Sequence, residues 1–212
     1  TQTGIPKQAF ENIVFEAQQI LGRCVNPQGP SGQRTGLVVG YVQSGKTLSF
    51  TTLTALAHDN GFALVVLIAG TLENLKQQTL GRLSSDLELS GNGIIRPWLL
   101  VDQPSENTSD ATLLRQHLKN WIDPLYPQHK KRVCVAVVLK HPKRIANLRD
   151  CLKSLELAKI PTLIIDDEAD QASLNTFAAS NQAKGTNRAS ANYREVLALK
   201  QVFPHHTYVQ YT

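Results

Sequence analysis

Short hydrophobic runs of strand length recur along the chain, separated by polar, glycine-rich or proline-rich stretches. Such runs are present at residues 36–39, 63–69, 94–101, 133–139, 162–165 and 207–211. Most of them are nearly continuous in hydrophobic character rather than alternating, which is typical of parallel strands covered on both faces. The pattern therefore predicts a sheet of buried parallel strands.

Segments with hydrophobic residues at helical spacing separate these strands. They lie at residues 46–59, 72–87, 110–122, 143–157 and 192–201, and another runs from residue 6 to residue 22. Strands that alternate with helices form right-handed crossovers in an open α/β sheet. We therefore expect a mostly parallel sheet flanked by helices, with ligands bound at the carboxyl ends of the strands.

The length of 212 residues fits a single domain with a substantial core. We expect residues 1–35 to form an N-terminal helix and loop that lead into a core domain of residues 36–212. The polar, aperiodic stretch at 174–190 predicts a mobile loop or insertion. Because the chain has no methionine and stops directly after a strand-like run, we expect it to be part of a longer protein.

The composition excludes several classes of protein. Hydrophobic residues make up 42% and charged residues 18% of the chain, values that do not fit a disordered or fibrous protein. No hydrophobic run reaches the roughly 18 residues of a membrane span, and no signal peptide is visible, so we expect a cytoplasmic protein without membrane contact.

Cysteine and histidine residues do not indicate a metal site. Cys24, Cys134 and Cys151 are widely spaced and form no CxxC pair, so we expect reduced thiols in the core rather than a disulfide or zinc site. His205 and His206 have no third metal ligand near them in the sequence, and we expect them to form a surface pair.

A phosphate-binding pattern follows the first predicted strand. Residues 40–47 read GYVQSGKT and match GxxxxGK[ST]. Backbone N–H groups of such a loop surround phosphate oxygens, and the helix that begins at Lys46 directs its positive end at the same anion. Lys46 would contact the β and γ phosphates, and the Thr47 hydroxyl would bind Mg²⁺. The alternative is a glycine-containing turn with an exposed lysine. Nucleotide contacts are expected from Gly40, Tyr41, Val42, Gln43, Ser44, Gly45, Lys46, Thr47 and Leu48.

Acidic residues end a later strand. Residues 162–170 read TLIIDDEAD. A carboxylate at the carboxyl end of a strand neighbouring the phosphate loop can hold Mg²⁺, and the next acid can polarise an attacking water. We therefore expect Asp167 to bind the metal, and Glu168 to act in catalysis together with Lys46. The alternative is a solvated acidic turn. Glu168 favours hydrolysis over transfer of phosphate to a small substrate, and the chain has no NKxD segment of the kind that GTPases use to read guanine.

These motifs resemble those of superfamily-two helicases. Residues 167–170 spell DEAD, and residues 40–47 resemble the first motif of that superfamily. More narrowly, the strings VVGYVQSGKT and IIDDEADQAS look like those of the "Z-one" domain, a helicase-like ATPase domain described as an endonuclease domain and found in bacterial proteins of restriction and phage defence. The likeness covers roughly residues 34–212 and is loose between the two motifs.

The resemblance implies the fold and the activity of a motor. It implies the first RecA-like domain of a P-loop NTPase that uses ATP and Mg²⁺, with a second RecA-like domain of the same polypeptide that supplies an arginine finger. Asp170 would couple the ATP site to the rest of the domain. Residues 69–79 lie where the family places a nucleic-acid-contacting motif. A nuclease or defence protein is a further expected partner.

Basic residues gather in one part of the sequence. Between residues 130 and 159 there are nine lysines and arginines against two acids, which makes a polyanion-binding surface a candidate. An ordinary solvated helix face explains the same pattern equally well. We expect contacts with DNA rather than RNA from Lys140, Lys143 and Arg144, after the strand at 133–139, and from Arg82 on another helix.

Three functions follow in order of preference. The first is a DNA-dependent ATPase that acts as a helicase or translocase. The second is an ATPase that serves as a switch or scaffold in a defence complex without moving along a strand. The third is a kinase that acts on a small substrate.

Overall fold

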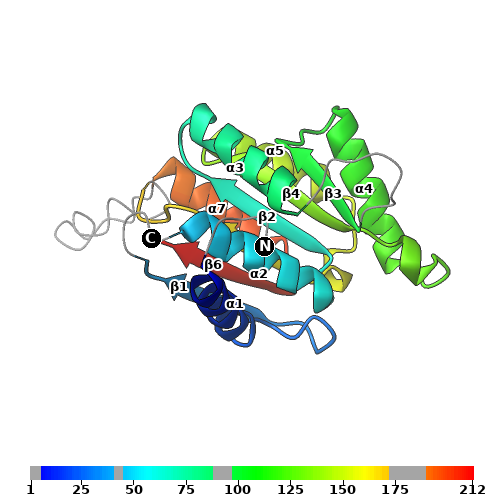
Figure 1. Cartoon of the computed structure of the whole chain (residues 1–212). Helices are drawn as coiled ribbons and strands as arrows, with labels where there is room; N and C mark the ends of the chain where they lie inside the picture. The colour runs from blue at the N-terminus through cyan, green and yellow to red at the C-terminus, as the bar shows by residue number, and fades with distance from the viewer. Residues whose placement is uncertain (1–5, 41–44, 88–96, 172–189) are drawn as a thin grey trace.

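A sheet of six parallel strands forms the centre of the domain (Figure 1). In this computed structural model, residues 6–40, 45–87, 97–171 and 190–212 are described. The strands lie in the order β1-β6-β5-β2-β4-β3, and each hydrogen-bonded pair is parallel. This confirms the predicted parallel α/β fold. The strands are β1 (Gln33–Val38), β2 (Leu64–Ala69), β3 (Trp98–Asp102), β4 (Val133–Leu139), β5 (Thr162–Asp166) and β6 (His206–Tyr211).

Helices cover both faces of the sheet, as Figure 1 shows. One layer contains α1 (Lys7–Leu21), α2 (Lys46–Asp59) and α3 (Glu73–Asp86). The other contains α4 (Ser109–Ile122), α5 (Pro142–Leu152) and α7 (Ala191–Gln201).

Side chains of the central strands pack against both helix layers, because successive side chains of a strand point to opposite faces. In β2, Val65 and Leu67 pack with α1, α2 and α3, whereas Leu64, Val66 and Ile68 pack with α4, α5 and α7. Every residue of β2 is buried. The continuous hydrophobic run in the sequence therefore has the predicted cause, which is burial on both faces.

The path of the chain determines which loops meet. The chain crosses the sheet from β1 through β2 to β3 with helices on one face, and then returns through β4 and β5 to β6 with helices on the other. Right-handed crossovers require this change of face when the direction reverses. The return path ends with β6 beside β1, so that β6 lies between β1 and β5. The carboxyl ends of β1, β6 and β5 are therefore neighbours in the sheet, although β1 lies far from β5 and β6 in the sequence.

Most predicted boundaries agree with the structure within a few residues, but the helix predicted at 143–157 is shorter. It begins at Pro142, behind a cap in which the His141 Nδ1 atom accepts from the N–H of Lys143, and it ends at Leu152. A 3-10 helix at Leu157–Lys159 follows. The chain leaves the α-helix here because Leu157 and Ile160 turn back into the core.

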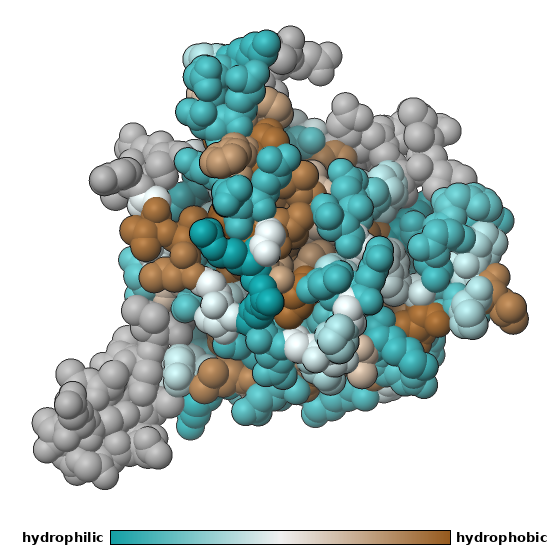
Figure 2. Space-filling view, turned by 90° about the horizontal axis from the view of Figure 1, so that it is seen from below, coloured by the Kyte–Doolittle hydropathy of each residue, from teal (hydrophilic) through white to brown (hydrophobic). Residues whose placement is uncertain are grey.

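The prediction that the first strand is covered on both faces is wrong. β1 begins at Gln33 and lies at the edge of the described sheet, where β6 is its hydrogen-bonded neighbour. Leu37 is 62% exposed and Val39 is 76% exposed. Figure 2 views the molecule from below Figure 1, the side near α1 and β1, and shows hydrophobic surface exposed among hydrophilic surface. A hydrophobic run alone does not distinguish an edge strand from a central one.

Candidate functional site

A polar pocket of about 180 Å³ lies at the carboxyl edge of the sheet. It brings together the start of α2, the loop after β2, the helix α3 and the acidic turn after β5. The residues that line it are Lys46, Thr47, Gly70, Leu75, Gln78, Thr79, Arg82, Asp167 and Glu168. The sequence predicted that the segment with Lys46 and Thr47 acts together with the segment with Asp167 and Glu168. Both segments line this pocket.

The start of α2 has a conformation that favours glycine. Gly45 caps the helix with a φ of 76°, in the left-handed region where a side chain is disfavoured. Lys46 is the first helical residue, so the backbone N–H groups of the first turn of α2 are available at this end. Thr47 and Leu48 follow in that turn, but Leu48 does not line the polar pocket. Tyr41, Val42, Gln43 and Ser44, which were also predicted to bind nucleotide, lie outside the described residues.

The acidic turn is held by its backbone. The N–H of Asp167 donates to Ile68 O at 3.0 Å, and the N–H of Ala169 donates to Tyr211 O at 2.8 Å. These bonds attach the turn to the ends of β2 and β6. Between them, Glu168 has a φ of 51°, a left-handed conformation that costs a non-glycine residue about 1 kcal/mol. The surrounding structure therefore selects a strained backbone at this residue.

The side chain of Lys140 forms a clamp on the same turn. Its Nζ atom donates to the main-chain oxygens of Asp167 and Glu168 at 2.5 Å and 2.7 Å. It also lies 2.9 Å from Asp166 Oδ1, an ionic contact without hydrogen-bond alignment. The other carboxylate oxygen of Asp166 accepts from the hydroxyl of Tyr208. The side chains of Lys140 and Asp166 are both fully buried.

This burial corrects the prediction that Lys140 contacts DNA. A phosphate backbone can reach only exposed cations, and the Lys140 ammonium is enclosed by three oxygens of β5 and its turn. The residue follows β4, whose carboxyl end lies at the same sheet edge as that of β5, with β2 between them. Its charge therefore stabilises the acidic turn and is not exposed on the surface of the domain.

One strand separates the two halves of the site in the sheet. β6 lies between β1, which leads into the predicted phosphate loop, and the acidic strand β5. The end of β6 bridges the gap. Gly40 donates to Thr212 O at 3.0 Å, and Ser49 Oγ lies 3.3 Å from the Tyr211 hydroxyl. The pocket nevertheless contains residues of both segments, Lys46 and Thr47 of one and Asp167 and Glu168 of the other.

The electrostatics of the pocket favour a bound cation. Burial raises the pKa of the Asp167 carboxyl above its usual range, and the negative charge of Glu168 raises it further. The positive charges of Lys140 and Lys46 oppose this rise. Burial and a neighbouring negative charge both disfavour the ionised form of a carboxyl group, and a cation beside the group stabilises that ionised form. Asp167 is therefore suited to bind a metal ion.

Gly70, at the end of β2, allows Glu168 to approach closely. A Cβ atom built on Gly70 would lie 3.1 Å from Glu168 Oε2, which is closer than ordinary van der Waals contact. No positive φ is involved, so glycine is favoured here by space and not by its backbone freedom. We did not predict this residue as part of the site, and the sequence does not signal it, because the contact spans β2 and β5.

Arg82 also lies in the pocket and not on a separate surface. It belongs to the second half of α3, and its Nη1 atom donates to Thr47 Oγ1 at 3.0 Å. The contact of Arg82 with DNA stays a prediction, and the structure places the residue beside the predicted metal ligand. The reason is tertiary: α3 packs against α2, and the bond from Arg82 to Thr47 joins the two helices.

Lys143 and Arg144 are exposed at the start of α5, as a role in binding DNA requires. Other members of the basic run are not available in the same way. Arg149 pairs with Glu195 at 2.7 Å, and Lys153 pairs with Asp150 at 2.9 Å. Part of the basic run is therefore the ordinary paired helix surface that the sequence left open as an alternative. Asp170 is exposed after the acidic turn.

Residues 69–79, where a nucleic-acid motif was expected, contain a buried lysine. Lys76 is fully buried, and its Nζ atom lies 2.6 Å and 2.8 Å from the two carboxylate oxygens of Asp102 and 2.8 Å from Glu73. It joins α3 to the end of β3. Its charge is therefore paired with carboxylates of the domain itself.

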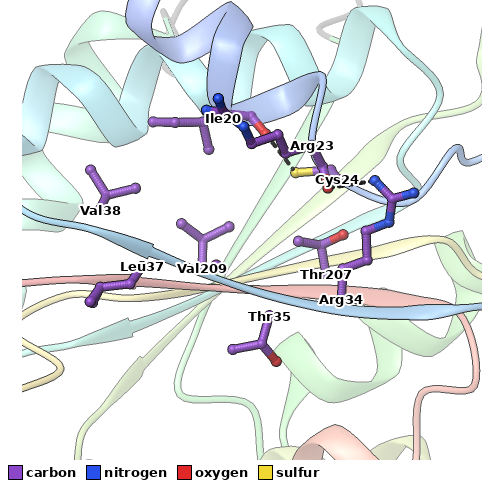
Figure 3. Close-up of a pocket in the computed structure, with 10 residues that line it drawn as sticks. Ile20, Arg23, Cys24, Arg34, Thr35, Leu37, Val38, Thr207 and Val209 are labelled. Atoms are coloured by element: carbon purple, nitrogen blue, oxygen red, sulfur yellow. Dashed lines mark hydrogen bonds between the residues drawn. The ribbon is translucent and has the colours of Figure 1, made fainter.

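A second cavity, of about 250 Å³, lies between α1 and β1 (Figure 3). It shares no lining residue with the polar pocket and is bordered by the aliphatic residues Ile20, Val38 and Val209. Arg34 donates to Arg23 O at 2.8 Å at this site. Burial raises the pKa of the Cys24 thiol to about 11, so this cavity contains no thiolate nucleophile at neutral pH.

The predicted state of the cysteines is confirmed, since Cys24, Cys134 and Cys151 are all buried and free. The prediction of a surface histidine pair is wrong, because His205 and His206 are both buried. His206 Nδ1 lies 2.7 Å from Phe203 O, so it is fixed by the backbone.

Membrane spans and metal clusters are both absent from the described residues. No helix in this part of the chain is long and hydrophobic enough to cross a membrane. Within the same residues, no three or more His, Cys, Asp or Glu side chains are grouped as a metal site.

Comparison with known proteins assigns no family. No family model matches the chain, and no curated protein matches it. The resemblance to the "Z-one" domain therefore stays a prediction that rests on the two motifs.

Proposed function

We propose that this chain binds ATP with Mg²⁺ and hydrolyses it, and that hydrolysis is coupled to a nucleic acid. One observation carries the proposal: Lys46, Thr47, Asp167 and Glu168, from two segments far apart in the sequence, line one polar pocket at the carboxyl edge of a parallel sheet. Ligands of such sheets bind at this edge. The pocket volume of about 180 Å³ suits the phosphate part of a nucleotide rather than the whole molecule.

The chemistry follows from the positions of the side chains. Lys46 would offset the charge of the β and γ phosphates at the start of α2. Glu168 would accept a proton from a water molecule whose oxygen forms a bond to the γ phosphorus. The bond between that phosphorus and its bridging oxygen then breaks, and the electron pair leaves with ADP. The products are ADP and inorganic phosphate.

The residues present also fit Mg²⁺. The Thr47 hydroxyl and the Asp167 carboxylate supply hard oxygen ligands in one pocket. Proteins usually hold Mg²⁺ through one or two such groups plus substrate phosphates and water. Thr47 and Asp167 would hold the ion, and Mg²⁺ would offset the charge that develops on the phosphate oxygens.

Coupling to a nucleic acid is proposed from Lys143 and Arg144. Both are exposed at the start of α5, which follows β4 at the same sheet edge as the pocket. Such cations bind phosphates without reading sequence. Together with the two motifs, this position supports a motor domain of the RecA-like, superfamily-two kind, whose second domain and arginine finger would come from elsewhere in the polypeptide.

ATP turnover measured with and without DNA tests the proposal. We expect release of inorganic phosphate in the presence of Mg²⁺, and a several-fold rise when single-stranded or duplex DNA is added. Binding of ATP with turnover that DNA leaves unchanged would favour a switch or scaffold. Transfer of phosphate to a small acceptor, without free phosphate, would favour a kinase. A chain that binds no nucleotide would refute the proposal.

A further inference from the structure

Arg82 and Thr47 form a polar contact between two helices in the pocket. The Arg82 Nη1 atom donates to Thr47 Oγ1 at 3.0 Å, and both residues line the pocket together with Lys46 and Glu168. Arg82 is otherwise exposed on α3. A long cationic side chain is therefore directed at the hydroxyl that the proposed function assigns to the metal.

We propose that Arg82 is the residue of this chain that contacts the terminal phosphate of a bound nucleoside triphosphate, and that it rests on Thr47 when no nucleotide is bound. This inference depends on the proposed function, because it names a further residue of the same site.

Arginine suits a phosphate better than a hydroxyl. Its planar guanidinium has five N–H donors in a fork that matches two phosphate oxygens at once. The contact with Thr47 uses one of these donors and a neutral acceptor. A phosphate adds a full opposite charge and can accept two of these donors at once, which a neutral hydroxyl cannot. A triphosphate held by Lys46 would therefore draw the guanidinium away from Thr47.

The exchange also releases the Thr47 hydroxyl. The guanidinium and a divalent cation are both positive, so their simultaneous contact with one hydroxyl oxygen is opposed by repulsion. Transfer of Arg82 to the phosphate removes this conflict, and Thr47 becomes available as the proposed metal ligand. The same transfer explains why a cation of α3 faces the start of α2.

The charges that line the pocket support a role for both of its cations. Two carboxylates, those of Asp167 and Glu168, line the pocket, and Lys140 is occupied by the buried Asp166 and by the backbone of the turn. Lys46 and Arg82 are the cations that line the pocket itself. A triphosphate brings more negative charge than one lysine offsets, and Arg82 is placed to neutralise the end distant from the nucleoside.

The test compares affinities for a triphosphate and a diphosphate, which does not require turnover. We would measure by calorimetry the binding of adenylyl imidodiphosphate and of ADP, each with Mg²⁺, to the whole chain. We expect Arg82→Gln to weaken the triphosphate about tenfold, as loss of one charge-assisted contact implies, and to leave the diphosphate within about twofold. Arg82→Lys, which keeps the charge but lacks the fork, should give an intermediate loss.

Arg194→Gln is the matched control, because Arg194 is also exposed on a helix but belongs to α7 in the opposite layer. It should bind both nucleotides as the unchanged chain does. Equal loss of both nucleotides in Arg82→Gln, or no loss of either, would overturn the inference. Reduced DNA binding with unchanged nucleotide discrimination would also overturn it and assign Arg82 to the nucleic acid. If the unchanged chain binds neither nucleotide, the proposed function itself fails.

Discussion

Lys140 and Glu168 are joined by a hydrogen bond from the buried ammonium of Lys140 to the main-chain oxygen of Glu168, at 2.7 Å. The same Glu168 has a φ of 51°. A buried cation thus fixes the backbone of the residue that we propose as the catalytic base. Because Lys140 also faces Asp166, stability and the geometry of the site depend on one side chain.

Replacement of Lys140 should be strongly destabilising. Lys140→Met leaves the buried carboxylate of Asp166 without its cation, and the free energy of unfolding should fall by about 3–5 kcal/mol, measured by urea denaturation. Lys143→Met is the control, because this exposed lysine nearby should change stability by less than about 0.5 kcal/mol. Similar effects of the two variants would contradict the clamp. Addition of Asp166→Leu to Lys140→Met should recover part of the loss, since an uncharged pair needs no cation.

Gly70→Ala should reduce turnover while leaving nucleotide affinity nearly unchanged. The added Cβ would meet Glu168 Oε2 at 3.1 Å, so the carboxylate must shift by a few tenths of an ångström. We expect kcat for ATP to fall by about tenfold, because small displacements of a catalytic group have large effects on rate. A steady-state phosphate-release assay measures the change.

Gly81→Ala provides the matched control for Gly70→Ala. Gly81 lies within α3, and a Cβ there meets nothing within 4 Å. Alanine should stabilise the helix by up to about 1 kcal/mol and leave kcat unchanged. Full activity in Gly70→Ala would show that Glu168 does not need its observed position.

Two substitutions separate nucleotide binding from hydrolysis. Lys46→Ala removes the charge at the start of α2 and should abolish nucleotide binding in a calorimetric titration. Glu168→Gln keeps the shape of the side chain but cannot accept a proton, so binding should persist while turnover falls at least about a hundredfold. Turnover retained in Glu168→Gln would move the general base to another residue.

The raised pKa values of the three cysteine thiols predict a loss of stability at alkaline pH. Burial raises the pKa of the thiols of Cys24 and Cys151 to about 11 and that of Cys134 to about 12. An unfolded thiol loses its proton near pH 8.5. Above that pH the unfolded chain binds fewer protons than the folded one, so stability is complete below about pH 8.5 and decreases as the pH rises towards 11.

Urea denaturation at pH 8 and pH 9.5 checks this dependence, in a window below the usual titration of tyrosine. The variant with alanine at Cys24, Cys134 and Cys151 should lose most of the decrease. Iodoacetamide at pH 8 should leave all three thiols of the folded chain unmodified and should alkylate them in urea. Rapid alkylation of the folded chain would contradict their burial.

Much of the fold could be predicted because its signals are local. The spacing of hydrophobic residues identified β2, β4 and α2 within a residue or so of their observed bounds. Helix and strand periods arise from backbone geometry within a few residues, so a short window of sequence contains them. The candidate site was also partly predictable, since residues 45–47 and 167–168 identify themselves by residue type and spacing.

The sequence by itself determined the strands, the helices and which acids and cations are candidates for chemistry. The tertiary structure alone decided that β1 is an edge strand, that Lys140 is buried against Asp166, and that Arg82 reaches Thr47. These features depend on the order of the strands or on the packing of α3 against α2. Strand order and helix packing are both set by free energies summed over residues far apart in the chain. No local pattern encodes such sums, and a lysine that binds DNA and a lysine that clamps a turn look alike until the chain has folded.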